Sequence, residues 1–299
     1  MNRGMNRLLL AIFILVIACY FVFNDLVEGD WGQLSGGWDN LSILWNESLW
    51  PPEWGMITDA YYNGCDPNSA FLCSKAFVGM LVTIKMAFVA TILGFVGAII
   101  LSPMAARNLA PVWVYVPIRI VLAATRSLPS IIWALVFIVV FGLGPLPGVL
   151  AMTFYTIGYL GKFQYEEMEG IQNEPLEATR AMGLSRAEIA INVVIPESSN
   201  SLLSQLLFMF EYNVRHGTVL GLVGAGGIGL HLQYYMGLFR YQEVMAFLVV
   251  IFVVVIVIDL MSMFLRSFVN EEGDVRRPSW FTVFLSPNKA VEIHHSEDE

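Results

Sequence analysis

The chain has 299 residues, of which 57% are hydrophobic and 14% charged, with a formal net charge of −9. A soluble domain normally carries about 25% charged residues. The composition therefore excludes an ordinary soluble protein and favours a polytopic membrane protein. The acidic balance, without a basic stripe, also argues against a nucleic-acid partner.

Six apolar runs predict membrane-spanning helices, and hence an all-α integral membrane protein. The first run follows two arginines. We favour an uncleaved span over a cleaved signal peptide, because no small-x-small cleavage site follows Phe23. Residues 112–124 are apolar but interrupted by a proline, and form either an interfacial helix or the start of the third span. The six runs are 8–23, 76–101, 130–141, 146–165, 202–223 and 244–268.

Residues 24–75 separate the first two runs and contain five tryptophans. They form either a docking surface for an external partner or an interfacial aromatic belt, and we favour the belt. Cys65 and Cys73 flank a short polar segment and have no neighbouring metal-ligand partners. If this loop lies outside the cytoplasm the two form a disulfide, and the alternative is two free thiols. Cys19 lies in the first apolar run, where packing explains it.

Basic residues in the short loops predict the orientation. They place both termini, residues 166–196 and a charged tail over 269–299 in the cytoplasm, and residues 24–75 outside. The chain then divides into a first span (1–23), an external loop (24–75), a transmembrane domain (76–268) and the tail. Arg215 and Arg240 break the rule, because this topology puts them at or near the outer side. Such exceptions are expected where a charge lines a pathway.

Residues 166–196 are a polar, helix-forming insert between two apolar runs. Glu174 and Pro175 predict a helix start, because proline is tolerated in the first turn. Small alanines on the following helix permit close approach, and a methionine supplies an adaptable apolar contact. These residues share one helix face with a glutamate: Glu177, Ala178, Ala181 and Met182.

Gly183 then allows a turn that other residues resist. Ser185 and Glu188 form a capping box for a second helix over residues 186–194, and Pro196 is expected to end that helix. A helix, a glycine hinge and a second helix along the membrane face predict a rigid element that docks into a motor subunit. The alternative is an ordinary amphipathic connector.

A polar cluster in the fifth run suggests a pathway. Glu211 and Arg215 are spaced to pair on one helix face. Either Arg215, with Asn213 and Thr218, lines a translocation path for an anion, or the pair is purely structural, and both readings stay open. Asp259, with Ser262, is interpreted as a helix-packing or tail-anchoring group and not as a ligand site.

Several patterns that mimic catalytic or cofactor sites fail on context. Gly224-Ala225-Gly226-Gly227-Ile228-Gly229 matches a dinucleotide fingerprint, but no βαβ unit surrounds it, so a close-packed turn is favoured. No Walker A or Gly-x-Ser-x-Gly sequence occurs, and no catalytic residue or resident cofactor is predicted. The histidines have no metal-ligand spacing, which predicts no metal site: His216, His231, His294 and His295.

The insert has the spacing of a known loop. Glu177-Ala178-Thr179, Gly183 and Pro196 resemble the cytoplasmic coupling loop, or EAA loop, of type I ATP-binding-cassette importer permeases, with Thr179 replacing an alanine. Over residues 77–266 the chain resembles phosphonate or phosphite transport permeases. The block from Glu211 to Gly229 is the most specific part. Further support comes from Ala105-Ala106-Arg107-Asn108, Arg126-Ser127-Leu128-Pro129, Glu166-x-x-Glu169 and Asp259-x-x-Ser262-x-x-x-Arg266.

This resemblance implies a type I permease (MetI-like) fold with about six spans in a prokaryotic cytoplasmic membrane. It implies an importer subunit that pairs with a second copy of itself, an ATPase subunit pair that binds ATP, and an external substrate-binding protein. The coupling residues would be Glu177, Ala178, Ala181, Met182, Gly183, Leu184 and Pro196. An external gate would include Gly224, Gly226, Gly227 and Gly229.

The cargo would be a phosphonate-type oxyanion. One rival is a permease of the same class for methionine or a quaternary amine. The rival from another class is an ATP-independent secondary carrier or an intramembrane enzyme, although no inverted repeat is evident in the sequence.

Overall fold

The computed structural model describes residues 3–59, 61, 64, 67–171 and 173–270. Over these residues the chain is built from helices, which confirms the all-α expectation. In chain order the helices are α1 (Arg3–Leu26), α2 (Gly32–Ile43), the π-helix η1 (Leu44–Leu49), α3 (Gly55–Thr58), the 3-10 helix η2 (Pro67–Cys73), α4 (Lys75–Ala105), α5 (Val112–Ser127), α6 (Ser130–Phe141), α7 (Pro145–Gly170), α8 (Asn173–Ala181), α9 (Arg186–Ile189), the π-helix η3 (Ala190–Val194), α10 (Ile195–Glu197), α11 (Ser199–Gly221), α12 (Ile228–Gly237) and α13 (Tyr241–Asn270).

Three helices in the described part of the chain are long and apolar enough to cross a membrane: α1, α4 and α13. A fourth span is possible by composition if α5 and α6, which meet at 86°, count as one broken span. The expected count of six therefore stays a prediction. Helices α7 and α11 are 26 and 23 residues long, which is sufficient length, but they are more polar than the three.

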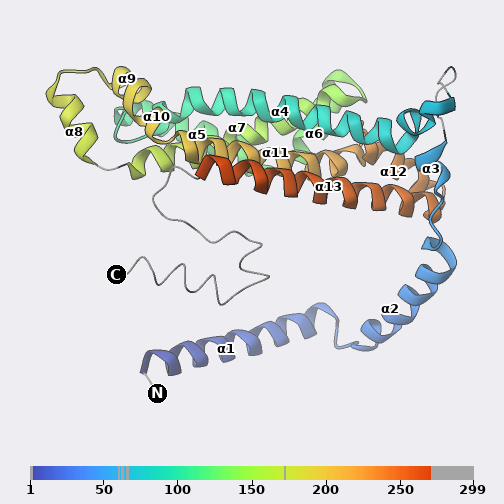
Figure 1. Ribbon diagram of the computed structural model, residues 1–299. Helices are drawn as coiled ribbons and strands as arrows, with labels where there is room; N and C mark the ends of the chain where they lie inside the picture. The colour runs from blue at the N-terminus through green and yellow to red at the C-terminus, as the bar shows by residue number, and fades with distance from the viewer. Residues whose placement is uncertain (1–2, 60, 62–63, 65–66, 172, 271–299) are drawn as a thin grey trace, which may run out of the picture.

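The bundle is organised around α4, which lies against α7, α11 and α12 (Figure 1). Small side chains on α4 allow this close packing. At Gly94, an added Cβ would lie 2.3 Å from the side chain of Thr156 on α7. The remaining contacts place α5 and α6 against α7, and α13 against α11. The buried alanines and glycines of α4 are Ala76, Gly79, Ala87, Ala90, Gly94, Ala98 and Ala105.

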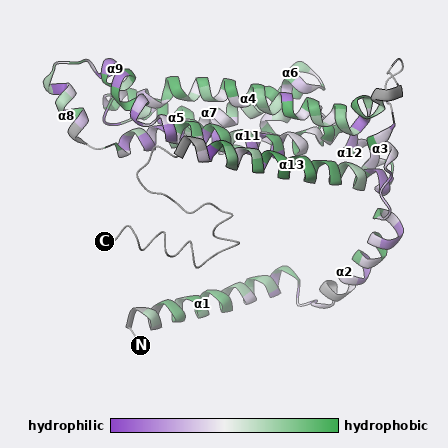
Figure 2. Ribbon diagram, viewed as in Figure 1, coloured by the Kyte–Doolittle hydropathy of each residue, from purple (hydrophilic) through white to green (hydrophobic). Residues whose placement is uncertain are grey.

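Helix α1 lies apart from this bundle and is joined to it through α2 (Figure 1). No part of the apolar stretch of α1 is buried against the rest of the chain. It is also among the most hydrophobic segments (Figure 2). The hydrophobic surface of α1 is therefore available to lipid or to another chain, and the core of the bundle forms without it.

The polar insert and the glycine-rich run lie in different parts of the bundle. Helices α8 and α9 project from one end, whereas α12 and α3 lie toward the other (Figure 1). At that second end, the backbone N–H of Glu53 donates to the carbonyl of Gln242, 3.1 Å away. This bond ties the segment before α4 to the start of α13.

Candidate functional site

The insert between α7 and α11 has two sharply different faces. Leu176 and Thr179 of α8 are buried, whereas the predicted docking residues point outward. The Thr179 hydroxyl donates to the carbonyls of Pro175 and Leu176, both 3.0 Å away. Thr179, the departure from the family pattern, therefore faces its own chain. The outward-facing residues are Glu177, Ala178, Ala181 and Met182, the last 68% exposed.

A turn at Gly183 follows α8. Its φ of +83° lies in the left-handed region that favours glycine. The N–H of Gly183 donates to the carbonyl of Arg180 at 3.0 Å, and that of Leu184 to Thr179 at 3.3 Å. Leu184 then packs against the buried cluster that includes Ile189. The turn is thus closed by hydrogen bonds and anchored by one apolar side chain.

Ser185 begins the second helical segment with the expected capping box. The Ser185 hydroxyl and backbone N–H donate to the Glu188 carboxylate at 2.7 and 2.8 Å. These bonds lower the pKa of the Glu188 carboxyl. They also satisfy backbone groups that a helix start leaves unpaired.

The expectation that Pro196 ends this helix is wrong. After α9 the chain passes through the π-helical turn η3, and Pro196 lies in the first turn of the next helix, α10. Proline lacks an N–H, so it is tolerated in a first turn where that donor has no helical partner. Pro196 remains exposed, and the chain continues almost directly into α11.

An ion-pair cluster of Glu169 with Arg107 and Arg119, here called the carboxylate clamp, lies next to the insert at the end of α7. Glu169 accepts from the Arg107 backbone at 2.6 Å and from its side chain at 3.1 and 3.2 Å, and it also pairs with Arg119. Partial burial opposes ionisation of Glu169. The hydrogen bonds from Arg107 and the charge of Arg119 outweigh it, so the pKa of this carboxyl lies below its usual value. Arg180 of α8 donates to the Asn108 carbonyl at 2.9 Å, which joins the insert to the clamp.

The predicted Glu211–Arg215 pair belongs to a larger network between α11 and α13. The two groups are 3.9 Å apart, but Arg215 lies closer to Asp259, at 2.6 Å, and Glu211 also pairs with Arg266. Two cations and two carboxylates make the network formally neutral. Asp259 lies about 27 Å along α13 from its start at Tyr241. Arg215 therefore lies opposite the middle of α13 and not at either of its ends.

The other predicted pathway residues on α11 make contacts within the chain. The Asn213 side chain is 1% exposed and donates to the hydroxyls of Thr91 and Thr156, at 2.9 and 3.0 Å. It thereby joins α11 to α4 and α7. The Thr218 hydroxyl donates to the Arg215 carbonyl at 2.6 Å.

The glycine-rich run forms a close-packed turn inside the bundle. Backbone N–H groups bind it to its neighbours: Ile228 donates to the Thr83 hydroxyl at 3.0 Å, and Gly144 to the Gly224 carbonyl at 3.1 Å. Thr83 lies about 12 Å along α4 from its start, so the turn lies within the bundle and not at the end where α4 begins. Positive φ angles occur at Gly224, Gly226 and Gly227, and a Cβ at Gly229 would lie 1.9 Å from the Thr218 carbonyl.

Sequence reasoning missed an aromatic seam between α7 and α11. We use this term for Tyr155 and Tyr159 of α7 with Tyr212 and His216 of α11. The rings of Tyr155 and Tyr212 stack at 5.6 Å, and those of Tyr212 and His216 at 3.9 Å. The Tyr212 hydroxyl donates to that of Tyr155, 3.0 Å away. The four-residue spacing on each helix was the available signal, but their pairing requires the fold.

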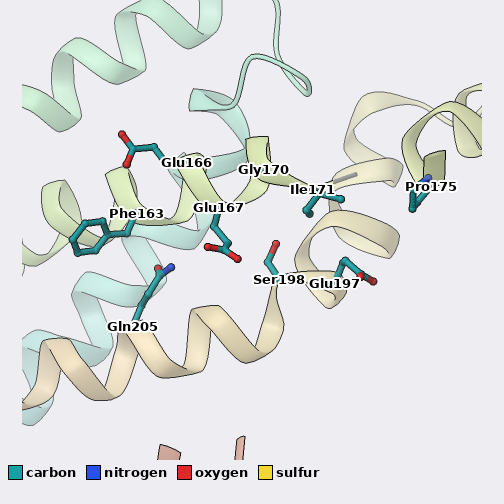
Figure 3. Close-up of a pocket in the computed structure, with 9 residues that line it drawn as sticks. All are labelled: Phe163, Glu166, Glu167, Gly170, Ile171, Pro175, Glu197, Ser198 and Gln205. Atoms are coloured by element: carbon teal, nitrogen blue, oxygen red, sulfur yellow. The ribbon is translucent and has the colours of Figure 1, made fainter. Parts of the chain in front are cut away.

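A cavity of about 730 Å³ opens beside the insert, between the end of α7 and the start of α11 (Figure 3). Phe163 and Gln205 lie at one side of it, and Ser198 and Glu167 face each other across its middle (Figure 3). The Phe163 ring also contacts Tyr159, with ring centroids 5.0 Å apart. The seam therefore continues into this cavity.

The cysteines are partly described. Cys73 is disulfide-bonded and Cys19 is free and exposed. Cys65, the predicted partner of Cys73, lies outside the described residues, so this pairing stays a prediction.

Comparisons with known proteins agree on one family. A family model described as "binding-protein-dependent transport system inner membrane component" matches residues 94–271. A phosphite transport system permease protein of Stutzerimonas stutzeri is 31% identical over 266 residues, 89% of each chain. A phosphate-import permease protein of Mycolicibacterium smegmatis is 35% identical over 202 residues, which is 67% of this chain and 38% of that protein.

Solved structures support the same fold. An inward-facing methionine ABC transporter aligns with a TM-score of 0.57 and 23% identity, covering 64% of this chain and 94% of that chain. A bacterial alginate ABC transporter aligns with a TM-score of 0.55 and 15% identity, covering 84% of this chain and 99% of that chain. At these identities the likeness shows the fold alone.

Proposed function

Because this chain belongs to the family of binding-protein-dependent transport system inner membrane components, we propose that it is the permease subunit of an ATP-driven importer for a phosphonate-type oxyanion. As a member of that family with apolar helices, it is a multi-pass inner-membrane protein. The transport cycle would alternate access to the two sides of the membrane, driven by ATP hydrolysis in a separate subunit.

The observation that carries the coupling part of this proposal is the outward face of α8. Glu177, Ala178, Ala181 and Met182 point away from their own chain, although three of them are small or apolar. Such a face is explained by a partner surface. We assign this face to contact with the ATPase subunit. Gly183 and Leu184 would hold the turn after α8, and Pro196 would hold the start of the helix that leads into α11.

The identity of the cargo rests on the relatives. They include phosphite and phosphate-import permeases and a putative phosphonate permease of Escherichia coli, 40% identical over 119 residues. Carnitine and choline permeases match at 26% and 24% identity, which makes a quaternary amine the rival cargo. Reconstitution with the ATPase pair and binding protein, followed by uptake of phosphite, methylphosphonate, phosphate or choline, tests the cargo. ATP-independent uptake would contradict the proposal.

The remaining parts of the assembly follow from the same proposal. A second copy of the chain would complete the route and present a second α8 to the ATPase pair, and an external binding protein would deliver the cargo. Both termini would lie in the cytoplasm, with the insert. The glycine-rich turn with Gly224, Gly226, Gly227 and Gly229 would act as the gate.

Arg215 is proposed to contact the anion by exchanging its bond to Asp259 for one to the cargo. Replacing Arg215 with Ala should raise the KM for oxyanion uptake about tenfold, because a guanidinium bond to a charged group is lost. Uptake titrations in proteoliposomes measure this.

The double variant Arg215→Ala/Asp259→Ala separates this role from a structural one. If the pair only holds α11 against α13, removing both charges should restore uptake. If Arg215 contacts the anion, the raised KM persists. Normal uptake with normal substrate affinity in Arg215→Ala would contradict the proposal.

A further inference from the structure

The aromatic seam differs in chemistry from the other exposed membrane surfaces of the bundle. The exposed faces of α4 and α13 carry mainly large apolar side chains, which suit lipid. On α4 these include Phe88 and Leu93, and on α13 Phe252 and Leu260. By contrast the half-buried seam presents phenol hydroxyls and an imidazole. Lipid offers these groups no hydrogen-bond partner, so at membrane depth they belong beside water, cargo or protein.

The composition of the two helices that carry the seam suits a position beside water, cargo or protein. Helices α7 and α11 are long enough to cross the membrane, yet neither is apolar enough to be a span exposed to lipid on all sides. Their buried sides face α4 through small and polar contacts such as Asn213 with Thr91. Their seam side carries Tyr155, Tyr159, Tyr212 and His216.

The seam extends along the bundle toward the insert. His216 neighbours Arg215 near the middle of the bundle, and the aromatic contacts continue through Tyr212, Tyr155 and Tyr159 to Phe163. Phe163 lines the cavity beside the insert (Figure 3). These contacts form a continuous polar and aromatic strip from the middle of the bundle to the cavity beside the insert.

The same two helices flank the insert. Helix α7 ends at Gly170 and α11 begins at Ser199, so both ends of the α8–α10 segment continue into helices that carry the seam. A displacement of α8 by a motor subunit would therefore act directly on the spacing between the Tyr155–Tyr159 stripe of α7 and the Tyr212–His216 stripe of α11. A wall that must open and close with each ATP cycle requires such a connection.

We propose that the seam is the cargo-facing wall of the inner half of the translocation route, where Tyr155, Tyr212 and His216 bind the tetrahedral oxyanion through neutral hydrogen-bond donors. The inference rests on the proposed function for the nature of the cargo. Neutral donors suit a route, because a cation at every step would hold the anion too tightly to release it. The rings lose little conformational freedom on binding, since each has only two side-chain torsions.

Kinetics of variants that each remove one hydrogen-bond donor test the ligand part. In the reconstituted full assembly, Tyr155→Phe, Tyr212→Phe and His216→Phe should each raise the KM for phosphite or methylphosphonate uptake about tenfold, the effect of one hydrogen bond to a charged group. Tyr115→Phe, which removes a phenol from α5, should behave as wild type. Unchanged KM values in all three variants, or a loss of turnover with unchanged KM, would overturn the proposal.

Thiol labelling tests the wall independently of the cargo. In a Cys19→Ser background, Phe208→Cys lies one turn before Tyr212 on the same face of α11, and Leu260→Cys lies on the apolar face of α13. Phe208 and Leu260 are 42% and 52% exposed. A membrane-impermeant sulfonate reagent should label position 208 in one nucleotide state and leave position 260 unlabelled, with protection at 208 by phosphite. No labelling at 208 in any state overturns the wall.

The two tests also separate this inference from the proposed function. If the wild-type assembly imports choline and no phosphorus oxyanion, both the proposed cargo and the ligand assigned to the seam are wrong. Wild-type oxyanion uptake that is insensitive to all three seam variants would overturn only the seam.

Discussion

Replacing Ala181 with Glu should reduce ATP-driven uptake by at least about 100-fold while the permease still folds and inserts. Ala181 lies on the outward face of α8, so a longer side chain meets little of its own chain. In a partner socket the new carboxylate would lose water without gaining a counter-ion, which costs on the order of 3 kcal/mol. Uptake by proteoliposomes and copurification of the ATPase subunit measure the two consequences.

Two control variants define how local this effect is. Thr179→Ala changes a buried position on the opposite face of α8 and should leave uptake near the wild-type level. Asn192→Glu introduces the same charge elsewhere in the insert, at an exposed position in η3. Wild-type uptake and ATPase binding in Ala181→Glu would rule out this face as the docking surface.

Replacing Glu169 with Gln should destabilise the permease by about 3 kcal/mol, because it leaves Arg119 without its carboxylate partner in a partly buried site. The Arg119 side chain is 26% exposed and stacks over Tyr165, so it cannot simply move into water. Thermal unfolding in detergent measures the loss. Glu166→Gln is the matched control: Glu166 lies one turn earlier on α7, is half exposed and, among the described residues, forms an ion pair only with Lys162, at 3.5 Å.

The depressed pKa of Glu169 gives this prediction a pH dependence. A carboxyl with a lowered pKa in the folded protein contributes stability above its unfolded pKa, about pH 4–5. That contribution is lost as the pH falls through the folded pKa. The difference in unfolding temperature between wild type and Glu169→Gln should therefore shrink below about pH 4. A difference that stays constant from pH 7 to pH 3 would contradict this account of the clamp.

Local patterns predicted the elements of this fold well. The capping box at Ser185 and the turn at Gly183 follow from preferences of single residues, and both are present. The run at 130–141 coincides with α6 because proline and glycine bound it. The helix past Pro196 was mispredicted, because the π-helical turn before it is a property of the whole segment and not of any one residue.

Partners distant in the sequence could not be predicted in the same way. Asp259 and Arg266 follow Arg215 by more than forty residues, and only the packing of α13 on α11 brings them together. The seam has the same origin, since its stripes lie on antiparallel stretches of two helices. A period along one helix identifies a face, but the neighbour of that face depends on tertiary packing.

The π-helical turn η3 allows the chain to differ in length by one residue at this point. A π turn holds one more residue than an α turn, so η3 absorbs an extra residue without breaking the path from Arg186 to Gly221. Removing one residue there would restore an ordinary α turn and preserve the direction of the α11 side chains. The same deletion within α11 would rotate every later side chain by about 100°. Insertions and deletions among homologous permeases should therefore gather at this turn.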